Sequence, residues 1–331
     1  MSYNTMISII VPVYNKEKWI AHQINSLLKQ DYRSFEIILV NDGSSDNSGK
    51  ICDDYSRNAN VTVIHQNNQG VCAARNAGFA IAKGKYIGFM DADDEIKPEM
   101  YQKMIEFCED NSLDIAICGT EVHQLDDKVM ISNGKGTTFV SNRFETVKMF
   151  LNGGYFTYGA CNKIYRKSII DNIKFQNGIK INEDKLFMYQ AICNSDRIGV
   201  LGKALFINHK RADSASTSYF NKSFFDIETV SSIICEDVKV RYSDLYPDAL
   251  YSRYRKLMEL IRRMCRENAL SIYPNEVDRI FDIIKSPCEY SQSKRLFSKK
   301  DRFERWLCVN HTNYYFRMVI FIYKLRRFYA N

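Results

Sequence analysis

Four short, nearly continuous apolar runs near the start of the chain constrain the fold more than any other feature. They lie at 7–13, 36–40, 61–64 and 86–90. Between them, the segments 18–29, 46–57 and 70–82 have the apolar spacing of amphipathic helices. Strands that are apolar on both faces belong in a parallel sheet covered by helices on each side. The sequence therefore predicts an α/β fold with a mainly parallel central sheet.

A polar cluster follows directly after each of these strands. The clusters are Tyr14-Asn15, Asn41 to Ser44, Gln66 to Gly70, and Asp91-Ala92-Asp93-Asp94. Ligands of open parallel sheets bind at the carboxyl ends of the strands. We therefore expect the four clusters to converge on one ligand-binding edge.

The rest of the chain divides into two regions. A helix at 98–110 and a strand at 115–118 continue the α/β pattern, and from about residue 221 the sequence is helical and basic. Residues 250–331 contain 18 Lys and Arg against 8 Asp and Glu, whereas residues 1–249 have a net charge of −3. A chain of 331 residues has room for more than one core. We expect a catalytic domain at 1–220 and a helical region at 221–331.

The acidic turn Asp91 to Asp94 places three carboxylates within four residues. Their mutual repulsion favours a bound cation, and Mg²⁺ or Mn²⁺ bridging a diphosphate fits oxygen ligands of this kind. The alternative is an acidic turn that caps the next helix, where Pro98 and Glu99 also suit a helix start.

Other classes of site have no support in the sequence. The cluster around Asp42 has neither the GxGxxG spacing of dinucleotide folds nor a phosphate-binding loop. The ten cysteines are scattered and form no CxxC pair, which argues against zinc and disulfides and for a reducing compartment. The apolar run at 6–13 follows no basic segment, so it indicates a buried strand rather than a signal peptide. We expect a cytoplasmic location, with peripheral attachment to the inner face of the cell membrane as a further hypothesis.

Five motifs occur in an order that resembles glycosyltransferase family 2. They are Pro12-Val13-Tyr14-Asn15, Val40 to Asp46, Gln69-Gly70, Ala74 to Gly78, and Asp91 to Asp94. The chain looks like bacterial cell-surface polysaccharide or teichoic-acid glycosyltransferases of that family. The resemblance covers residues 5–120 and extends more loosely to about 220, which divides the domain into a nucleotide half and an acceptor half (120–220).

The resemblance implies a GT-A fold that binds a nucleotide sugar. In such relatives Pro12 and Tyr14 flank the nucleotide and Asp42 reads the uracil. Arg75 lies near the diphosphate, Asp91 approaches the ribose and Asp93 binds the metal. The implied donor-binding residues are Pro12, Tyr14, Asn15, Asp42, Gln69, Arg75, Asp91 and Ala92.

The acceptor half contains the acidic pair Glu183-Asp184 at the start of an amphipathic segment. The resemblance assigns Asp184 as the base that deprotonates the acceptor hydroxyl, with Glu183 as the reserve candidate. The alternative is an ordinary helix start enriched in acids.

The segment from His209 to Ser216 resembles a loop that closes over the diphosphate. It implies Arg211 as a stabiliser of leaving-group charge, His209 as a second metal ligand, and Ser214 and Ser216 as donor contacts. An exposed basic loop is the alternative.

The last helical segment, from Phe303 to Tyr329, interleaves aromatic and basic residues. This composition suits docking on an anionic membrane surface. Its longest stretch without charge, Met318 to Tyr323, is far shorter than the roughly 20 residues that span a bilayer. Packing on its own domain or on a second subunit, as in a homo-oligomer, is the alternative. No nucleic-acid-binding module accompanies the basic residues.

Together these features predict an inverting, metal-dependent transferase of hexose or N-acetylhexosamine. It would use a UDP-sugar donor and a hydroxyl of a growing cell-surface glycan or a lipid-linked acceptor. The alternative is a non-catalytic nucleotide-sugar or glycan-binding protein on the same fold.

Overall fold

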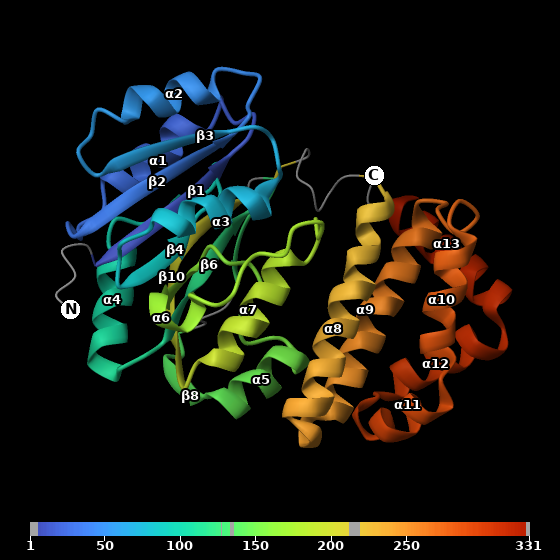
Figure 1. The fold of residues 1–331 in the computed structure, drawn as a ribbon. Helices are drawn as coiled ribbons and strands as arrows, with labels where there is room; N and C mark the ends of the chain where they lie inside the picture. The colour runs from blue at the N-terminus through green and yellow to red at the C-terminus, as the bar shows by residue number, and fades with distance from the viewer. Residues whose placement is uncertain (1–5, 127, 133–135, 212–218, 329–331) are drawn as a thin grey trace. The chain divides into compact units, whose positions relative to one another are not determined.

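The chain forms two compact units, Met1–Ser214 and Ala215–Asn331. The computed structural model describes residues 6–126, 128–132, 136–211 and 219–328. The first unit contains the sheet and the second is built from helices (Figure 1).

The sheet of the first unit has strand order β3-β2-β1-β4-β9-β6-β10-β5, with β7 beside β6 and β8 beside β10. The strands are β1 (Ile7–Val13), β2 (Phe35–Asp42), β3 (Val61–Gln66), β4 (Tyr86–Phe89), β5 (Glu95–Ile96), β6 (Ile115–His123), β7 (Val129–Ser132), β8 (Phe139–Asn142), β9 (Lys163–Arg166) and β10 (Arg197–His209). β1 to β4 pair in parallel, β9 lies antiparallel between β4 and β6, and β10 is parallel to β6. This confirms the predicted α/β class and its mainly parallel sheet.

Helices cover both faces of this sheet (Figure 1). They are α1 (Ile20–Leu28), α2 (Ser48–Tyr55), α3 (Val71–Ile81), α4 (Met100–Asn111), α5 (Arg143–Asn152), α6 (Lys167–Ile170) and α7 (Glu183–Asn194). In α1, Ile20, Ile24 and Leu27 share one face and are fully buried in the core with β1 and β2. In α3, Gly78 allows a close approach to β1, because a Cβ atom there would lie 2.5 Å from Ile10 Cγ2.

Most of the strands and helices in the first hundred residues begin and end within about two residues of the positions expected from the sequence. Later elements extend beyond what the sequence indicates. β6 continues from the predicted strand at 115–118 to His123, and β10 runs beside it with register shifts between Leu201 and Phe206. The outer halves of these strands are only partly buried, so they lack the apolar signature of β1 and β2.

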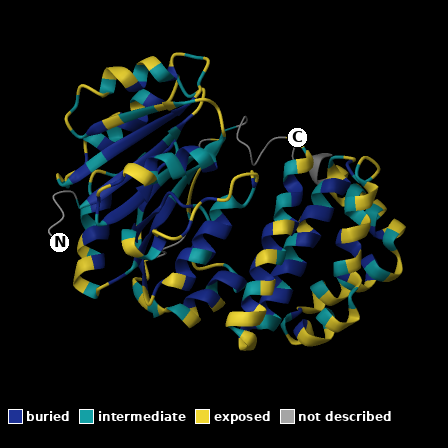
Figure 2. Ribbon diagram, viewed as in Figure 1, coloured by how far each residue is buried: buried dark blue, intermediate teal, exposed yellow. Residues whose placement is uncertain are grey.

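The second unit packs its helices around α9 (Tyr246–Arg266). Its other helices are η1 (Lys222–Phe225), α8 (Asp226–Arg241), η2 (Ser243–Leu245), α10 (Pro274–Lys285), α11 (Pro287–Ser293), η3 (Lys294–Leu296), α12 (Lys299–Asn310) and α13 (Thr312–Phe328). Leu257, Ile261 and Met264 of α9 are buried, whereas the outer faces of the helices are exposed (Figure 2). Within the described residues, no helix has the length and apolar character needed to cross a membrane.

Candidate active site

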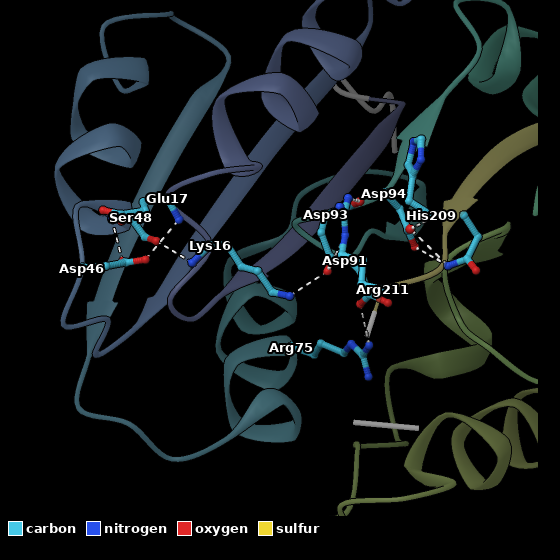
Figure 3. Close-up of polar contacts among 11 residues, drawn as sticks. Lys16, Glu17, Asp46, Ser48, Arg75, Asp91, Asp93, Asp94, His209 and Arg211 are labelled. Carbon is cyan, nitrogen blue, oxygen red and sulfur yellow. Dashed lines mark hydrogen bonds and ion pairs between the residues drawn. The ribbon is translucent and has the colours of Figure 1, made fainter. Parts of the chain in front are cut away.

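The acidic turn Asp91 to Asp94 connects β4 to β5, and its three carboxylates contact three different parts of the first unit (Figure 3). Asp91 Oδ1 lies 3.0 Å from Arg75 Nη2. Asp93 Oδ2 lies 2.6 Å from Lys16 Nζ. Asp94 accepts hydrogen bonds from the Asn208 side chain at 3.1 Å. The turn is therefore a junction between the loop after β1, helix α3 and β10.

Two cations surround the carboxylate of Asp93. Besides Lys16, Arg211 places its Nε 3.4 Å from Asp93 Oδ2. The Arg211 guanidinium also lies over the ring of Trp19, 3.6 Å from its centroid. This fixes Arg211 beside the acidic turn, where its charge can act on a bound anion.

Asp94 is buried, with only 4% of its surface exposed. Burial and repulsion from Asp91 raise the pKa of Asp94 to about 8, although hydrogen bonds from Asn208 and the His209 backbone oppose the rise. These bonds tie the turn to the end of β10. Asp94 therefore anchors the turn, a role that the sequence left open.

Arg75, on α3, is the centre of the site and is 2% exposed. Its Nη1 lies 2.6 Å from Asp184 Oδ1 and 3.2 Å from Glu183 Oε1, while Nη2 contacts Asp91. The guanidinium lies 5.0 Å from the centroid of the Phe175 ring. One buried cation thus joins the acidic turn to the acidic pair of α7.

The acidic pair Glu183-Asp184 occupies the first turn of α7, after Asn182 in a left-handed conformation (φ 69°). Burial and the neighbouring Asp184 raise the pKa of Glu183 to about 7, while Arg75 opposes this rise. Burial likewise raises the pKa of Asp184 above its ordinary value, against the opposing charge of Arg75. A carboxylate with a pKa near 7, as at Glu183, can accept a proton near neutral pH.

The opposite oxygen of Asp184 accepts a hydrogen bond from the Ala160 backbone at 3.3 Å. The loop containing Ala160 leads into β9, whose Lys163 is fully buried. Lys163 Nζ donates to the Gly159 carbonyl oxygen and to Asn162 Oδ1, and burial lowers the pKa of Lys163 to about 8. Lys163 therefore supports the loop that holds Asp184.

Asp42, at the end of β2, is hydrogen-bonded to the end of β3 and to the loop that follows it. Its Oδ1 accepts hydrogen bonds from the Gln66 side chain at 2.7 Å and the Gln69 backbone at 2.9 Å. Its Oδ2 accepts one from the Gly70 backbone at 2.8 Å. Asp42 thus fixes the loop after β3 and keeps it beside β2.

The loop after β1 joins the same edge. Asn15, in a left-handed conformation (φ 52°), accepts a hydrogen bond from the Ser45 backbone at 2.9 Å and donates one to Ser44 Oγ. Tyr14 is half-exposed and Pro12 is partly buried. Of the remaining donor candidates, Gln69 is exposed and Ala92 is buried. The structure therefore links the polar clusters that the sequence places at this edge.

The loop from His209 to Ser216 is only partly described. His209 Nε2 lies 2.7 Å from Glu95 Oε1, and Arg211 contacts Asp93. Ser214 and Ser216, which the resemblance assigns to donor binding, lie outside the described residues.

Several residues of the site have no distinct signal in the sequence. Lys16 pairs with the acidic turn, Phe175 lies beside Arg75, and Asn208 anchors Asp94. Lys16 directly follows the Tyr14-Asn15 cluster, which is the one available hint. Phe175 and Asn208 lie in segments without a recognisable pattern.

Asp93 is the carboxylate of the acidic turn that the resemblance assigns to a divalent cation. No group of three or more His, Cys, Asp or Glu side chains in the described part of the chain is arranged to hold a metal. Mg²⁺, however, commonly uses one or two carboxylates together with substrate phosphates. Lys16 and Arg211 pair with Asp93, so a metal ion bound by this carboxylate would take the place of at least one of them.

Comparison with known proteins gives a family match over the site. Residues 8–174 match the sequence profile of glycosyl transferase family 2. The uncharacterized glycosyltransferase EpsJ of Bacillus subtilis is 36% identical over 214 residues, which cover 63% of this chain and 62% of EpsJ. The poly(ribitol-phosphate) beta-N-acetylglucosaminyltransferase TarS of Staphylococcus aureus is 28% identical over 75% of this chain and 43% of TarS. This chain spans less than two thirds of each of these relatives.

A crystal structure of residues 1–349 of S. aureus TarS resembles this fold. It superposes with a TM-score of 0.76 at 23% identity and covers 97% of this chain and 92% of that structure. The complex of the same TarS fragment with UDP-GlcNAc superposes with a TM-score of 0.72. The likeness extends over both units of the chain.

Proposed function

This chain belongs to glycosyl transferase family 2, and from that premise we propose that it transfers a sugar from a UDP-sugar to a hydroxyl group of a glycan. The first unit has the GT-A-like fold of the TarS fragment. The proposed acceptor is a growing cell-surface glycan or a lipid-linked sugar, and the proposed sugar is a hexose or N-acetylhexosamine. The UDP-GlcNAc complex of TarS supports a uridine diphosphate donor.

The contact of Arg75 with both Asp91 and Asp184 carries this proposal. For transfer, the anomeric carbon of the donor sugar must lie within reach of the acceptor hydroxyl that the base deprotonates. Asp91 belongs to the turn that follows β4, and Asp184 belongs to the acceptor half. Their contact with the same buried cation supports the proposal that the two halves share one reaction centre.

The proposed chemistry is a single displacement with inversion. Asp184 accepts the proton of the acceptor hydroxyl, and the hydroxyl oxygen forms a bond to the anomeric carbon of the donor sugar. The bond from that carbon to the diphosphate oxygen breaks, and UDP leaves with the electron pair. Arg211 and Lys16, which surround Asp93, are placed to offset the charge of the leaving diphosphate.

Mn²⁺ or Mg²⁺ is the proposed cofactor, held by Asp93. When bound, such an ion would stabilise negative charge on the diphosphate. His209 could also bind the ion, through Nδ1 or through Nε2, and binding through Nε2 would require that atom to release Glu95, which lies 2.7 Å away. We therefore assign Asp93 the principal role.

The second unit supports a proposed attachment to anionic membrane surfaces. On α13, Tyr314, Arg317, Phe321 and Lys324 are exposed and follow one another at helical spacing. The helix contains no Asp or Glu. Aromatic and basic side chains on one face suit the headgroup region of a bilayer.

Release of UDP in the presence of a UDP-sugar tests the enzymatic proposal. We expect divalent-metal-dependent UDP release that increases when a glycan acceptor is added. A chain that binds UDP-sugars but releases no UDP under any metal would be a binding protein, and the proposal would be wrong.

A further inference from the structure

The loop at 171–182 connects α6 to α7 and leads directly into the acidic pair Glu183-Asp184. Phe175, near the middle of this loop, is buried, with 2% of its surface exposed. Its backbone is hydrogen-bonded to the side chain of Asn76, which directly follows Arg75 on α3. The segment that enters α7 is therefore joined to the helix that carries Arg75.

Both polar atoms of the Asn76 side chain bond to the backbone of Phe175. Asn76 Nδ2 donates to the Phe175 carbonyl oxygen at 2.8 Å, and Asn76 Oδ1 accepts from the Phe175 backbone N–H at 3.0 Å. A side-chain amide carries a donor and an acceptor, so it can exchange two bonds with one residue, as a hydrogen-bonded pair of antiparallel strands does. The two bonds fix the position of the Phe175 backbone and, with it, the point from which the ring projects.

The Phe175 ring contacts both Arg75 and the helix that carries the proposed base. The Arg75 guanidinium lies 5.0 Å from the ring centroid. The ring of Phe187, three residues after Asp184 on α7, stacks on it with centroids 4.1 Å apart and planes at 3°. Phe89 of β4 packs against it edge-on, with centroids 5.0 Å apart. Because rings packed in this way cannot shift singly, the position of Phe175 affects both Arg75 and α7.

The Arg75 guanidinium is not oriented by hydrogen bonds alone. Its two Nη atoms contact carboxylates, but its buried Nε has no hydrogen-bond partner among the described residues. An aromatic ring within about 6 Å attracts a guanidinium group. The Phe175 ring is therefore a contact that helps to keep Arg75 in the orientation that places Nη1 2.6 Å from Asp184 Oδ1.

We infer that Asn76 is a positioning residue of the proposed reaction: it holds Phe175, and Phe175 keeps the Arg75 guanidinium on the Asp184 carboxylate. The inference rests on the proposed function, in which Asp184 is the base. A nearby cation favours the ionised carboxylate, which is the form that accepts the acceptor proton. Without the two bonds from Asn76 the ring can shift, and the ionised base then loses part of its counter-charge.

Hydrogen exchange of the loop at 171–182 tests the first step and needs no activity. In Asn76→Ala the exchange of this loop should become about tenfold faster or more, because the Phe175 N–H loses its acceptor. Asn221→Ala is the matched control, since the Asn221 side chain also donates to a backbone carbonyl and accepts from a backbone N–H, both at 3.0 Å, but in the second unit. It should leave the loop unchanged. Equal exchange of the loop in the wild type and Asn76→Ala would overturn the inference.

The pH dependence of transfer tests the second step. Acceptor-dependent UDP release should rise with pH as the base ionises, and a base with less counter-charge ionises at higher pH. The acidic limb of kcat/KM should therefore move up by about one pH unit in Asn76→Ala and stay in place in Asn221→Ala. The other titratable groups around Asp184 are the same in all three proteins: Asp91, Cys161, Lys163, Tyr165 and Glu183. Lower activity with an unmoved limb would mean that Asn76 only supports the loop, and would overturn the inference.

Phe175→Leu tests whether Asn76 acts through the ring. This variant removes the aromatic face beside Arg75 but keeps an apolar side chain, so it should move the limb in the same direction as Asn76→Ala. The double variant Asn76→Ala/Phe175→Leu should move the limb no further than Phe175→Leu alone, because both changes act through one contact. Additive shifts would show that Asn76 acts by another route, and the inference would be wrong.

UDP release by the wild type separates this inference from the proposed function. A wild type that releases UDP, compared with an Asn76→Ala variant whose limb does not move, would refute only the role of Asn76. A wild type that releases no UDP with any UDP-sugar would refute the proposed function, and the positioning role would fall with it.

Discussion

The Arg75 guanidinium and the Asp184 carboxylate lie 2.6 Å apart, although the two residues are separated by 109 positions in the chain. The same guanidinium contacts Asp91 at 3.0 Å and Glu183 at 3.2 Å. One buried cation therefore neutralises part of the charge of three carboxylates. Arg75 thereby opposes the rise that burial and Asp184 cause in the pKa of Glu183.

Arg75→Met should destabilise the protein by about 3 to 5 kcal/mol, because it leaves buried carboxylates without their cation. Urea denaturation at neutral pH measures the change. Arg57→Met is the control, since Arg57 pairs with Asp54 at 3.5 Å on the surface and its loss should cost less than about 0.5 kcal/mol. Equal stabilities for the two variants would show that Arg75 does not hold the site together.

Asp184→Asn should bind UDP normally but lose transfer by about 10² to 10⁴-fold, because an amide cannot accept the acceptor proton. Glu183→Gln, one position away, should lose less, because Glu183 is not the assigned base. UDP titration and acceptor-dependent UDP release measure the two properties. A larger loss in Glu183→Gln would transfer the role of base to Glu183.

Much of the site's outline can be predicted from sequence, because it depends on local patterns. The strand ends at Asp42 and Asp91 follow from continuous apolar runs and from the rule that parallel strands present their carboxyl ends together. The expectation that Arg75 lies near the diphosphate identified the residue but not its partners. Its contact with Asp184 depends on how α3 and α7 pack, which no local pattern encodes.

The later strands were harder to predict for a related reason. β9 enters the sheet antiparallel between β4 and β6, and its four residues are too short for a periodic signal. The burial of Gln23, on α1, has no signal in the sequence, because a glutamine on a helix is ordinarily exposed. Its burial is a property of the tertiary structure.

Asp93→Ala should abolish metal-dependent UDP release, because Asp93 is the carboxylate assigned to the cation. Isothermal titration of Mn²⁺ in the presence of UDP should show that the variant binds the metal at least tenfold more weakly, a loss of about 1.4 kcal/mol or more. Asp110→Asn, an exposed carboxylate at the end of α4, is the control and should match the wild type. Unchanged Mn²⁺ binding by Asp93→Ala would exclude Asp93 as the ligand.

Asp94 should make the protein less stable as the pH rises. Its pKa is about 8 in the folded chain and about 3.9 in an unfolded one. The folded state therefore binds more protons between these values, so this contribution is fully present below pH about 4 and is lost as the pH rises through about 8. The slope from one such group is at most about 1.4 kcal/mol per pH unit.

Asp94→Asn removes this titration and keeps a carbonyl oxygen for the Asn208 and His209 donors. Its free energy of unfolding should therefore fall less steeply than that of the wild type between pH about 5 and about 8. Chemical denaturation at several pH values gives both slopes. If the free energy of unfolding fell equally steeply with pH in both proteins, Asp94 would not be the group that binds the additional proton in the folded state.

The exposed face of α13 should bind anionic lipid through Arg317 and Lys324. Each basic residue near an anionic bilayer contributes about 1 kcal/mol, so the double variant Arg317→Glu/Lys324→Glu should bind more than tenfold more weakly. Co-sedimentation with vesicles of phosphatidylglycerol and phosphatidylcholine measures binding, and pure phosphatidylcholine vesicles should bind little of either protein.

The double variant Lys239→Glu/Arg241→Glu on α8 makes the same change in net charge elsewhere in the second unit, where both residues pair with acids on their own helix. If net charge alone attracted the chain to the bilayer, both double variants would lose binding equally. If a specific face of α13 binds the bilayer, only the Arg317→Glu/Lys324→Glu variant should lose binding to anionic vesicles. Replacing Phe321, which lies between them on the same face, by serine should weaken that binding further.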